Sequence, residues 1–161
     1  MAEVTRNNIP HEVEREMNSI LGQVCCRQHV GNDGSLFLGF GGIFFTKTSR
    51  GEAPHGKWEV GTYRSAWRIV ENQSIICGSK EAIDSVEELR PFVGKLEGAT
   101  CAKISMLTEF DVRVEFGKEL SVDFMAACGD GDEVFHAFLA QGQVASFSSV
   151  GGWVLAASRK P

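Results

Sequence analysis

Alternation between apolar and polar residues is the dominant pattern in this chain, and it predicts β-strands. In residues 111–117, Val112, Val114 and Phe116 alternate with charged residues, as in an antiparallel strand with one buried and one solvated face. An Asn-Asp-Gly turn at residues 32–34 separates the first two such segments. The same reasoning predicts strands at about 24–30, 35–42, 58–64, 66–71, 74–78, 100–107, 111–117, 119–126, 133–139, 143–148 and 152–158.

Two segments have helical spacing instead. In the first, Pro10 lies near the predicted start, Gly22 follows the end, and the apolar residues between them are Ile9, Val13, Met17, Ile20 and Leu21. In the second, Ser79 is a predicted N-cap, and an apolar stripe is formed by Ile83, Val86 and Leu89. Pro91 is expected to end or kink this helix.

Each helical segment precedes a similar stretch of sequence. Residues 22–41, GQVCCRQHVGNDGSLFLGFG, align without a gap with residues 98–117, GATCAKISMLTEFDVRVEFG, so Cys25 meets Cys101 and Phe40 meets Phe116. We therefore predict an α+β fold made of an internally duplicated unit, one helix followed by an antiparallel β-meander, with pseudo-two-fold symmetry. The two copies would span about residues 9–78 and 80–158 of a single domain, residues 1–161. Their sheets could join edge to edge or face each other.

Composition is that of an ordinary globular protein, with 43% hydrophobic and 23% charged residues in a chain of 161. The net charge of −5 predicts no general attraction to nucleic acid and suits a protein partner with a basic surface. No apolar run is long enough for a membrane span, and the N-terminus lacks the apolar stretch of a signal peptide. The cysteines number five, without a CxxC motif, which predicts free thiols in a reducing cytoplasm. The sequence leaves the oligomeric state open.

The two copies differ in an insertion and in the exposed face of one strand. Residues 46–57 are extra in the first copy and are locally basic, and we expect either a mobile solvated loop or a binding loop. Where the second copy has Arg113 and Glu115, the first has Phe37 and Gly39. This flat apolar face predicts a covering element: the insertion itself, the other sheet or a partner, with cover from within the chain favoured.

Residues 58–69, WEVGTYRSAWRI, are the most distinctive segment. Tyr63, Arg64 and Arg68 are residue types that dominate binding interfaces, and on a strand the two arginines would share one face. Such a pair could hold a carboxylate or a phosphate. The alternative is structural, with both tryptophans in the core and both arginines paired with acids.

Catalytic and metal motifs are absent from the sequence. No two histidines have zinc-ligand spacing, and GxSxG, HExxH and GxxxxGK[ST] do not occur. Cys25 and His29 would share a strand face, but no third group is evident to orient them as a nucleophilic pair. We therefore predict no catalytic residue, no metal and no cofactor.

Residues 35–41, SLFLGFG, and residues 65–69, SAWRI, resemble segments of small uncharacterised bacterial α+β proteins, some of the immunity-protein type. The resemblance covers mainly residues 22–71 and implies no catalytic residues. We predict a non-catalytic cytosolic protein-binding protein of the immunity or inhibitor type, with Arg50, Tyr63, Arg64 and Arg68 as binding residues. One alternative is a domain that binds a small anion through Arg64 and Arg68 in a cleft between the copies. A lesser alternative is an enzyme with an unrecognised site.

Overall fold

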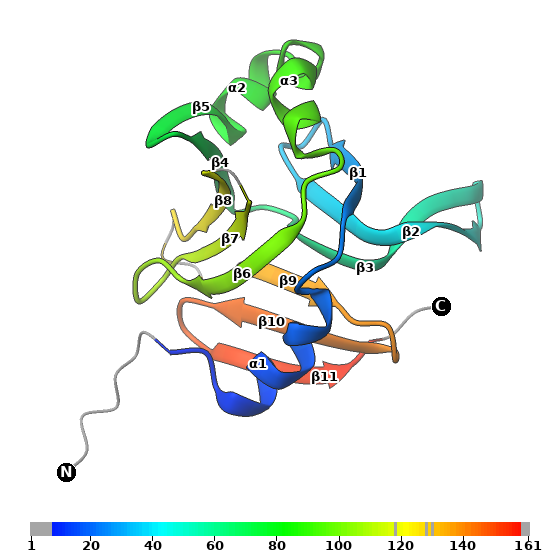
Figure 1. Cartoon of the computed structure of the whole chain (residues 1–161), viewed down its shortest axis with the longest axis vertical. Helices are drawn as coiled ribbons and strands as arrows, with labels where there is room; N and C mark the ends of the chain where they lie inside the picture. The colour runs from blue at the N-terminus through cyan, green and yellow to red at the C-terminus, as the bar shows by residue number, and fades with distance from the viewer. Residues whose placement is uncertain (1–7, 118, 128, 130, 159–161) are drawn as a thin grey trace.

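The computed structural model describes residues 8–117, 119–127, 129 and 131–158. Two antiparallel sheets dominate these residues, with short helices around them (Figure 1). The six-stranded sheet contains, in spatial order, β1 (Cys25–Val30), β2 (Leu36–Thr48), β3 (Gly51–Thr62), β9 (Glu133–Phe138), β10 (Gln143–Ser148) and β11 (Gly152–Ala157). The five-stranded sheet contains β5 (Ser74–Gly78), β4 (Ala66–Glu71), β8 (Leu120–Met125), β7 (Val112–Phe116) and β6 (Cys101–Met106).

The strand predictions are confirmed, and nine of the eleven strands agree with the predicted bounds to within a residue or two. The exceptions are β2 and β3, which continue through residues 43–57, where the sequence predicted the end of a strand and a loop. A glycine pair is the reason. Gly41 and Gly42 have φ angles of 80° and 104° and form a bulge that bends β2 without ending it.

The predicted fold class is wrong. The described residues are mostly β, with only three short α-helices, and neither half of the chain builds a helix-then-meander unit of its own. Strands β4 and β5, from the first half, join the sheet of β6, β7 and β8. Strands β9, β10 and β11, from the second half, extend the sheet of β1, β2 and β3. The chain passes from one sheet to the other twice. Each sheet therefore contains strands from both predicted copies, and the copies do not form separate structural units.

The helices are shorter than their apolar spacing predicts. The first segment contains α1 (His11–Met17) and a 3-10 turn, Asn18–Ile20; the second contains α2 (Ser79–Asp84), α3 (Val86–Val93) and a 3-10 turn, Gly94–Leu96. The second breaks at Ser85, which has extended backbone, whereas Pro91 lies inside α3. Ser79 was the predicted N-cap, but it is the first residue of the helix, and Gly78 is at the N-cap position. The Ser79 hydroxyl instead accepts a hydrogen bond from the backbone N–H of Trp67. The side chain of Ile83 lies outside the described residues.

No helix in the described ranges is long and apolar enough to cross a membrane.

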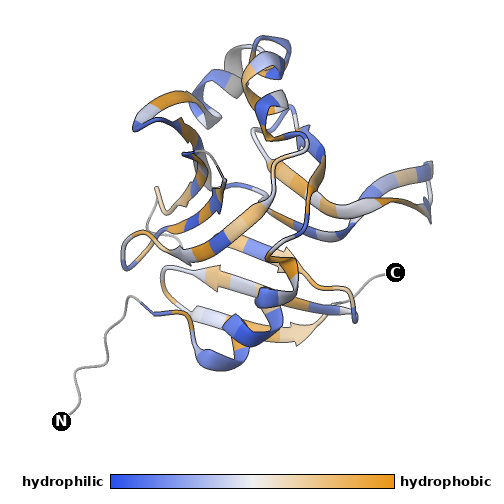
Figure 2. Cartoon of the chain, viewed as in Figure 1, coloured by the Kyte–Doolittle hydropathy of each residue, from blue (hydrophilic) through white to orange (hydrophobic). Residues whose placement is uncertain are grey.

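One apolar core joins the two sheets. The rings of Phe40 and Phe116 stack with centroids 6.1 Å apart, and those of Phe124 and Phe135 meet edge to face at 5.2 Å. Hydrophobic positions alternate along the strands that surround this core (Figure 2). Hairpins β1–β2 and β6–β7 have matching registers, because Cys25 pairs with Phe40 as Cys101 pairs with Phe116 and each hairpin has a bulge at the same place. Whether the chain arose from copies at residues 9–78 and 80–158 stays a prediction.

Candidate functional site

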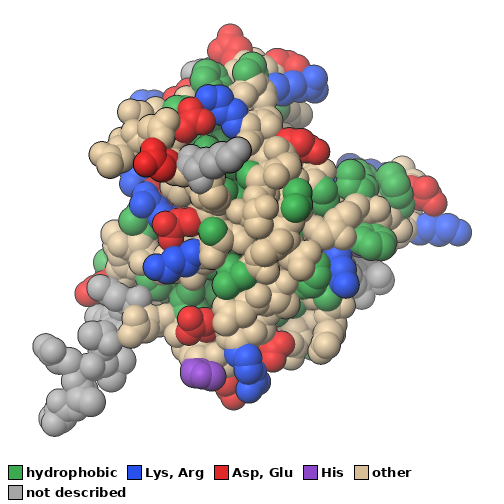
Figure 3. Space-filling view, viewed as in Figure 1, with side chains coloured by type: hydrophobic (Ala, Val, Ile, Leu, Met, Phe, Trp, Pro, Cys, Tyr) green, Lys and Arg blue, Asp and Glu red, His purple; other side chains and the backbone are tan. Residues whose placement is uncertain are grey.

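The main candidate site is a two-stranded arm, residues 41–57, which projects from the body of the protein (Figure 1). Its apolar side chains face solvent: Ile43, Phe44 and Phe45 are 51%, 49% and 65% exposed. Figure 3 shows hydrophobic side chains along the arm and charged ones at its tip. Successive strand residues point to opposite faces, so Ile43 and Phe45 lie on one face of the arm and Phe44 on the other. Exposed large apolar residues of this kind are a recognised property of interaction surfaces.

Among the residues that the structure describes, the arm is a strand pair without further neighbours. β1 pairs with β2 only as far as Phe40, and β9 pairs with β3 only from Glu59 onward, so both edges of the arm are open. Pro54 lies on one of these edges, where a missing N–H costs no ladder hydrogen bond. Within the arm, the rings of Phe44 and His55 stack at 6.2 Å, and the His55 ring contacts the Thr46 hydroxyl. An isolated hairpin is only marginally stable, so the arm can adapt to a surface.

The base of the arm lies across the flat face of the six-stranded sheet. A Cβ atom on Gly56 would lie 2.7 Å from the Gly39 Cα and 2.5 Å from the Phe40 N, so only glycine fits there. The Gly56 N–H donates a hydrogen bond to Glu59, and Glu59 also pairs with Arg27 at 3.1 Å. Of the three covering elements that the sequence left open, the chain's own insertion is the one that lies against this face at Gly39.

A cleft of about 610 Å³ lies between the arm and the sheet. Arm residues 46–49 and 55–57 form one side, and Glu59, Tyr63 and Phe138 form the other. Tyr63 is half exposed, and its ring contacts Phe37 at 5.1 Å and buried His136 at 4.8 Å. Burial raises the pKa of Tyr63, with smaller contributions from the Glu133 and Glu59 carboxylates. The phenol therefore stays protonated at neutral pH and offers both a donor and an acceptor.

The predicted binding residues are not brought together as one group. Arg50 lies in the turn at the arm's tip, and Tyr63 and Arg64 lie where the chain leaves the six-stranded sheet. Arg64 is 81% exposed and reaches Asp132 at 4.0 Å. Arg68 lies on β4 of the other sheet, where it binds the buried carboxylate of Asp123 at 2.8 Å. Residues 63–65 form a bend as the chain changes sheet, so the two arginines do not share a strand face as expected. Whether these residues bind a partner stays a prediction.

The candidate Cys25–His29 pair does not form. The bulge between Cys25 and Arg27 shifts the strand by one residue, so Cys25 shares the core face with Phe40 while His29 stacks on Phe37 at the opposite face. Burial raises the pKa of the Cys25 thiol to about 11, which keeps it protonated. Cys25, Cys26, Cys77 and Cys101 are free thiols, and Cys128 lies outside the described residues.

Sequence reasoning missed two groups. The first is the run Ile43-Phe44-Phe45, for which the available signal was three large apolar residues placed between a glycine pair and a basic segment. The second is the cluster of Arg68, Arg113 and Asp123, which comes from three strands and has no local signature.

No group of three or more His, Cys, Asp or Glu side chains gathers as metal ligands within the described part of the chain. Comparisons with protein-family models, curated proteins and solved structures found no match for the chain. The resemblance to bacterial immunity-type proteins therefore stays a prediction.

Proposed function

We propose that this chain is a non-catalytic binding protein, of the immunity or inhibitor type, that contacts a protein partner through its arm. The observation that supports this most is the exposure of Ile43, Phe44 and Phe45 on a projecting strand pair with two open edges. Exposed apolar strands promote aggregation, and proteins protect such edges unless they use them. Pro54 on the open edge of β3 is one such protection, and it leaves the side chains available.

The cleft beside the arm adds a place for a partner's side chain. Tyr63 contributes a rigid aromatic surface with a polar hydroxyl, a combination that is enriched at the centres of interfaces. Arg50 at the tip and Arg64 beyond Tyr63 extend the proposed surface on either side of the cleft. Arg68 is not part of this surface, because its guanidinium is held by Asp123 on the other sheet.

The charge of the arm refines the expected partner. A basic partner surface was expected because the whole chain has a net charge of −5. The arm itself, however, carries Lys47, Arg50 and Lys57 against a single acid, Glu52. We therefore propose an apolar groove bordered by acidic residues at the point of contact, and a basic surface only where the partner faces the acidic body. The four free thiols suit a reducing compartment, and we propose the cytoplasm.

The test compares three baits: the wild-type protein, a Phe44→Ser/Phe45→Ser double variant, and a Phe110→Ser control. Phe110 is 49% exposed, as Phe44 is, but lies outside the arm. Partners captured from the native host are identified by mass spectrometry, and their affinities for all three baits are then measured. We expect the double variant to bind about 30-fold more weakly or worse, and the control to bind normally.

Folding must be unchanged for this comparison to be valid. All three proteins should have free energies of unfolding within about 0.5 kcal/mol of one another, because the substituted side chains are exposed. A captured partner that binds the double variant as tightly as the wild type would contradict the proposal. Equal losses in the double variant and in the Phe110 control would also contradict it, because the effect would then not depend on the arm.

A further inference from the structure

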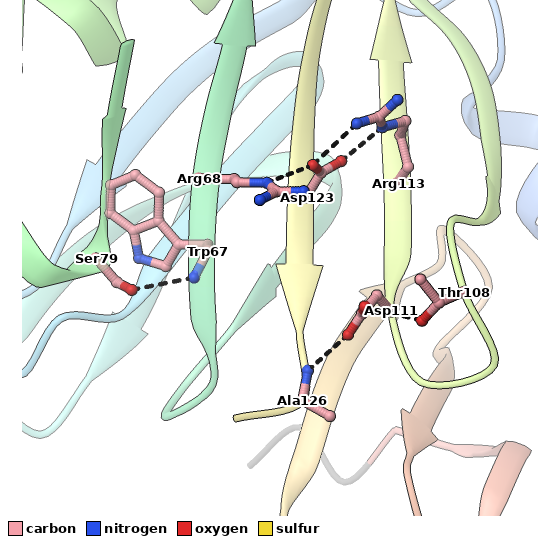
Figure 4. Close-up of polar contacts among 8 residues, drawn as sticks. All are labelled: Trp67, Arg68, Ser79, Thr108, Asp111, Arg113, Asp123 and Ala126. Carbon is pink, nitrogen blue, oxygen red and sulfur yellow. Dashed lines mark hydrogen bonds and ion pairs between the residues drawn. The ribbon is translucent and has the colours of Figure 1, made fainter. Parts of the chain in front are cut away.

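The outer face of the five-stranded sheet holds one buried carboxylate between two arginines (Figure 4). Asp123 on β8 is fully buried; its oxygens accept hydrogen bonds from the Arg68 Nε at 2.8 Å and from the Arg113 Nε and Nη2 at 2.6 and 3.0 Å. The three residues lie side by side on adjacent strands, because Arg68 and Arg113 both pair with Asp123 in the register. The carboxylate thus fixes the direction of both guanidinium groups.

This arrangement leaves positive charge and hydrogen-bond donors available. Two guanidinium groups share one carboxylate, so the trio has a formal charge of +1. The arginine side chains remain 33% and 29% exposed. Arg68 is bound to Asp123 through Nε, and within the described residues neither of its terminal nitrogens has a hydrogen-bond partner. A pair of terminal N–H groups in one plane matches the two oxygens of a carboxylate.

The two arginines of this trio form one end of a surface hollow of about 490 Å³. Glu115 lies two residues beyond Arg113 on β7, and Glu119 follows in the next turn; both line the hollow at its other end. Val70 and Ile75 provide an apolar side. Two residues along a strand correspond to about 7 Å, so cationic and anionic groups face each other across roughly that distance.

We propose that this hollow binds a small zwitterion, such as an α-amino acid with an apolar side chain. The ligand's carboxylate binds Arg68 and Arg113, its ammonium group faces Glu115 and Glu119, and its side chain lies against Val70 and Ile75. The four ionisable residues that line the hollow, Arg68, Arg113, Glu115 and Glu119, have a formal net charge of zero. The charge of −1 on buried Asp123 is offset by Lys103, which pairs with Glu115 in the register, and this balance suits a ligand without net charge. This site is separate from the arm and goes beyond the proposed partner binding.

Titration calorimetry with leucine as the probe tests this assignment. Three analogues separate the recognition elements: 4-methylpentanoate lacks the ammonium group, leucinamide lacks the carboxylate, and inorganic phosphate is a simple anion. We expect leucine to bind and each analogue to bind about tenfold more weakly or worse, because each leaves a charged group of the site unpaired. Arg68→Gln is expected to weaken leucine binding at least tenfold, and the exposed Arg90→Gln control is expected to leave it unchanged.

Thermal melting of each variant shows whether a loss of binding is a loss of folding. If Arg68→Gln melts early, Arg68→Lys keeps the charge but loses the planar pair of N–H groups, and weaker leucine binding is again expected. No binding of leucine up to about 10 mM would overturn the proposal. Phosphate binding more tightly than leucine, or equal leucine affinity in wild type and Arg68→Gln, would also overturn it. The Phe44→Ser/Phe45→Ser variant should bind leucine normally, so failure here is distinct from failure of the proposed function.

Discussion

The outer faces of the two sheets differ strongly, although the hairpins that form them have the same register. In the six-stranded sheet, Phe37 and Gly39 lie opposite His29 and Arg27, and the base of the arm covers Gly39. In the five-stranded sheet, the corresponding positions of β7 are Arg113 and Glu115, and the face is open around a buried Asp123. The side chains that face the shared core must be apolar in both hairpins. The side chains on the outer face of each sheet are free to differ, and here one face has a covering segment and the other a charged cluster.

The largest expected effect concerns what the two hairpins share. Phe40 and Phe116 are buried at matching positions and stack on each other. We expect Phe40→Ala and Phe116→Ala each to lower the free energy of unfolding by about 3–5 kcal/mol, because each leaves a cavity in the core. Chemical denaturation measures this. A loss of less than about 1 kcal/mol for one of them would show that the two hairpins do not contribute equally to the core.

The next effect concerns the charged outer face. Asp123→Asn removes the negative charge that both arginines bind, and we expect a loss of about 2 kcal/mol in unfolding free energy. This loss is less than for a fully buried pair because the arginines are partly exposed. Replacing all three residues with apolar ones (Arg68→Met, Arg113→Met and Asp123→Leu) should restore much of that stability. An Asp123→Asn protein that unfolds like the wild type would show that the cluster does not stabilise the sheet.

The covered face is tested by Gly56→Ala. The added methyl group would collide with backbone atoms of Phe40, Trp58 and Gly39, which cannot move independently of the sheet. We expect a loss of about 1–2 kcal/mol and faster proteolysis of the arm, because the arm must lift from the sheet. Gly117→Ala is the matched control at the end of β7, where a Cβ would meet no atom within 4 Å. Equal behaviour of the two variants would contradict close contact between the arm and the sheet.

The effect that is smallest at neutral pH, and grows only in alkaline solution, concerns thiols at matching positions. Burial raises the pKa of Cys25 to about 11 and that of Cys101 to about 12, whereas an unfolded thiol has a pKa of about 8.5. Above that pH the unfolded chain releases protons that the folded chain keeps, so the free energy of unfolding falls as the pH rises. Replacing both cysteines with alanine should flatten this dependence between about pH 8 and pH 10. An unchanged slope, or rapid labelling of either thiol in the folded protein, would contradict their burial.

Strand positions could be predicted because alternation along the chain is a local property. The division of the strands into two sheets could not be predicted, because the sequence does not show that β4 pairs with β8 and that β3 pairs with β9. The arm was missed because Gly41-Gly42 was interpreted as the end of a strand, whereas positive φ angles allow a bulge within one. Tyr63 lies across a cleft from the arm, which no pattern in the sequence indicates. The partner of Arg68 is Asp123, which lies 55 residues away in the sequence.

Hydrogen exchange of the protein alone and in complex with its captured partner tests the central claim most directly. The arm's backbone amides belong to a strand pair with open edges, so they should exchange quickly in the free protein. We expect slower exchange at residues 43–57 in the complex and little change around Arg113 and Asp123. Protection confined to the five-stranded sheet, with the arm exchanging as it does in the free protein, would contradict it.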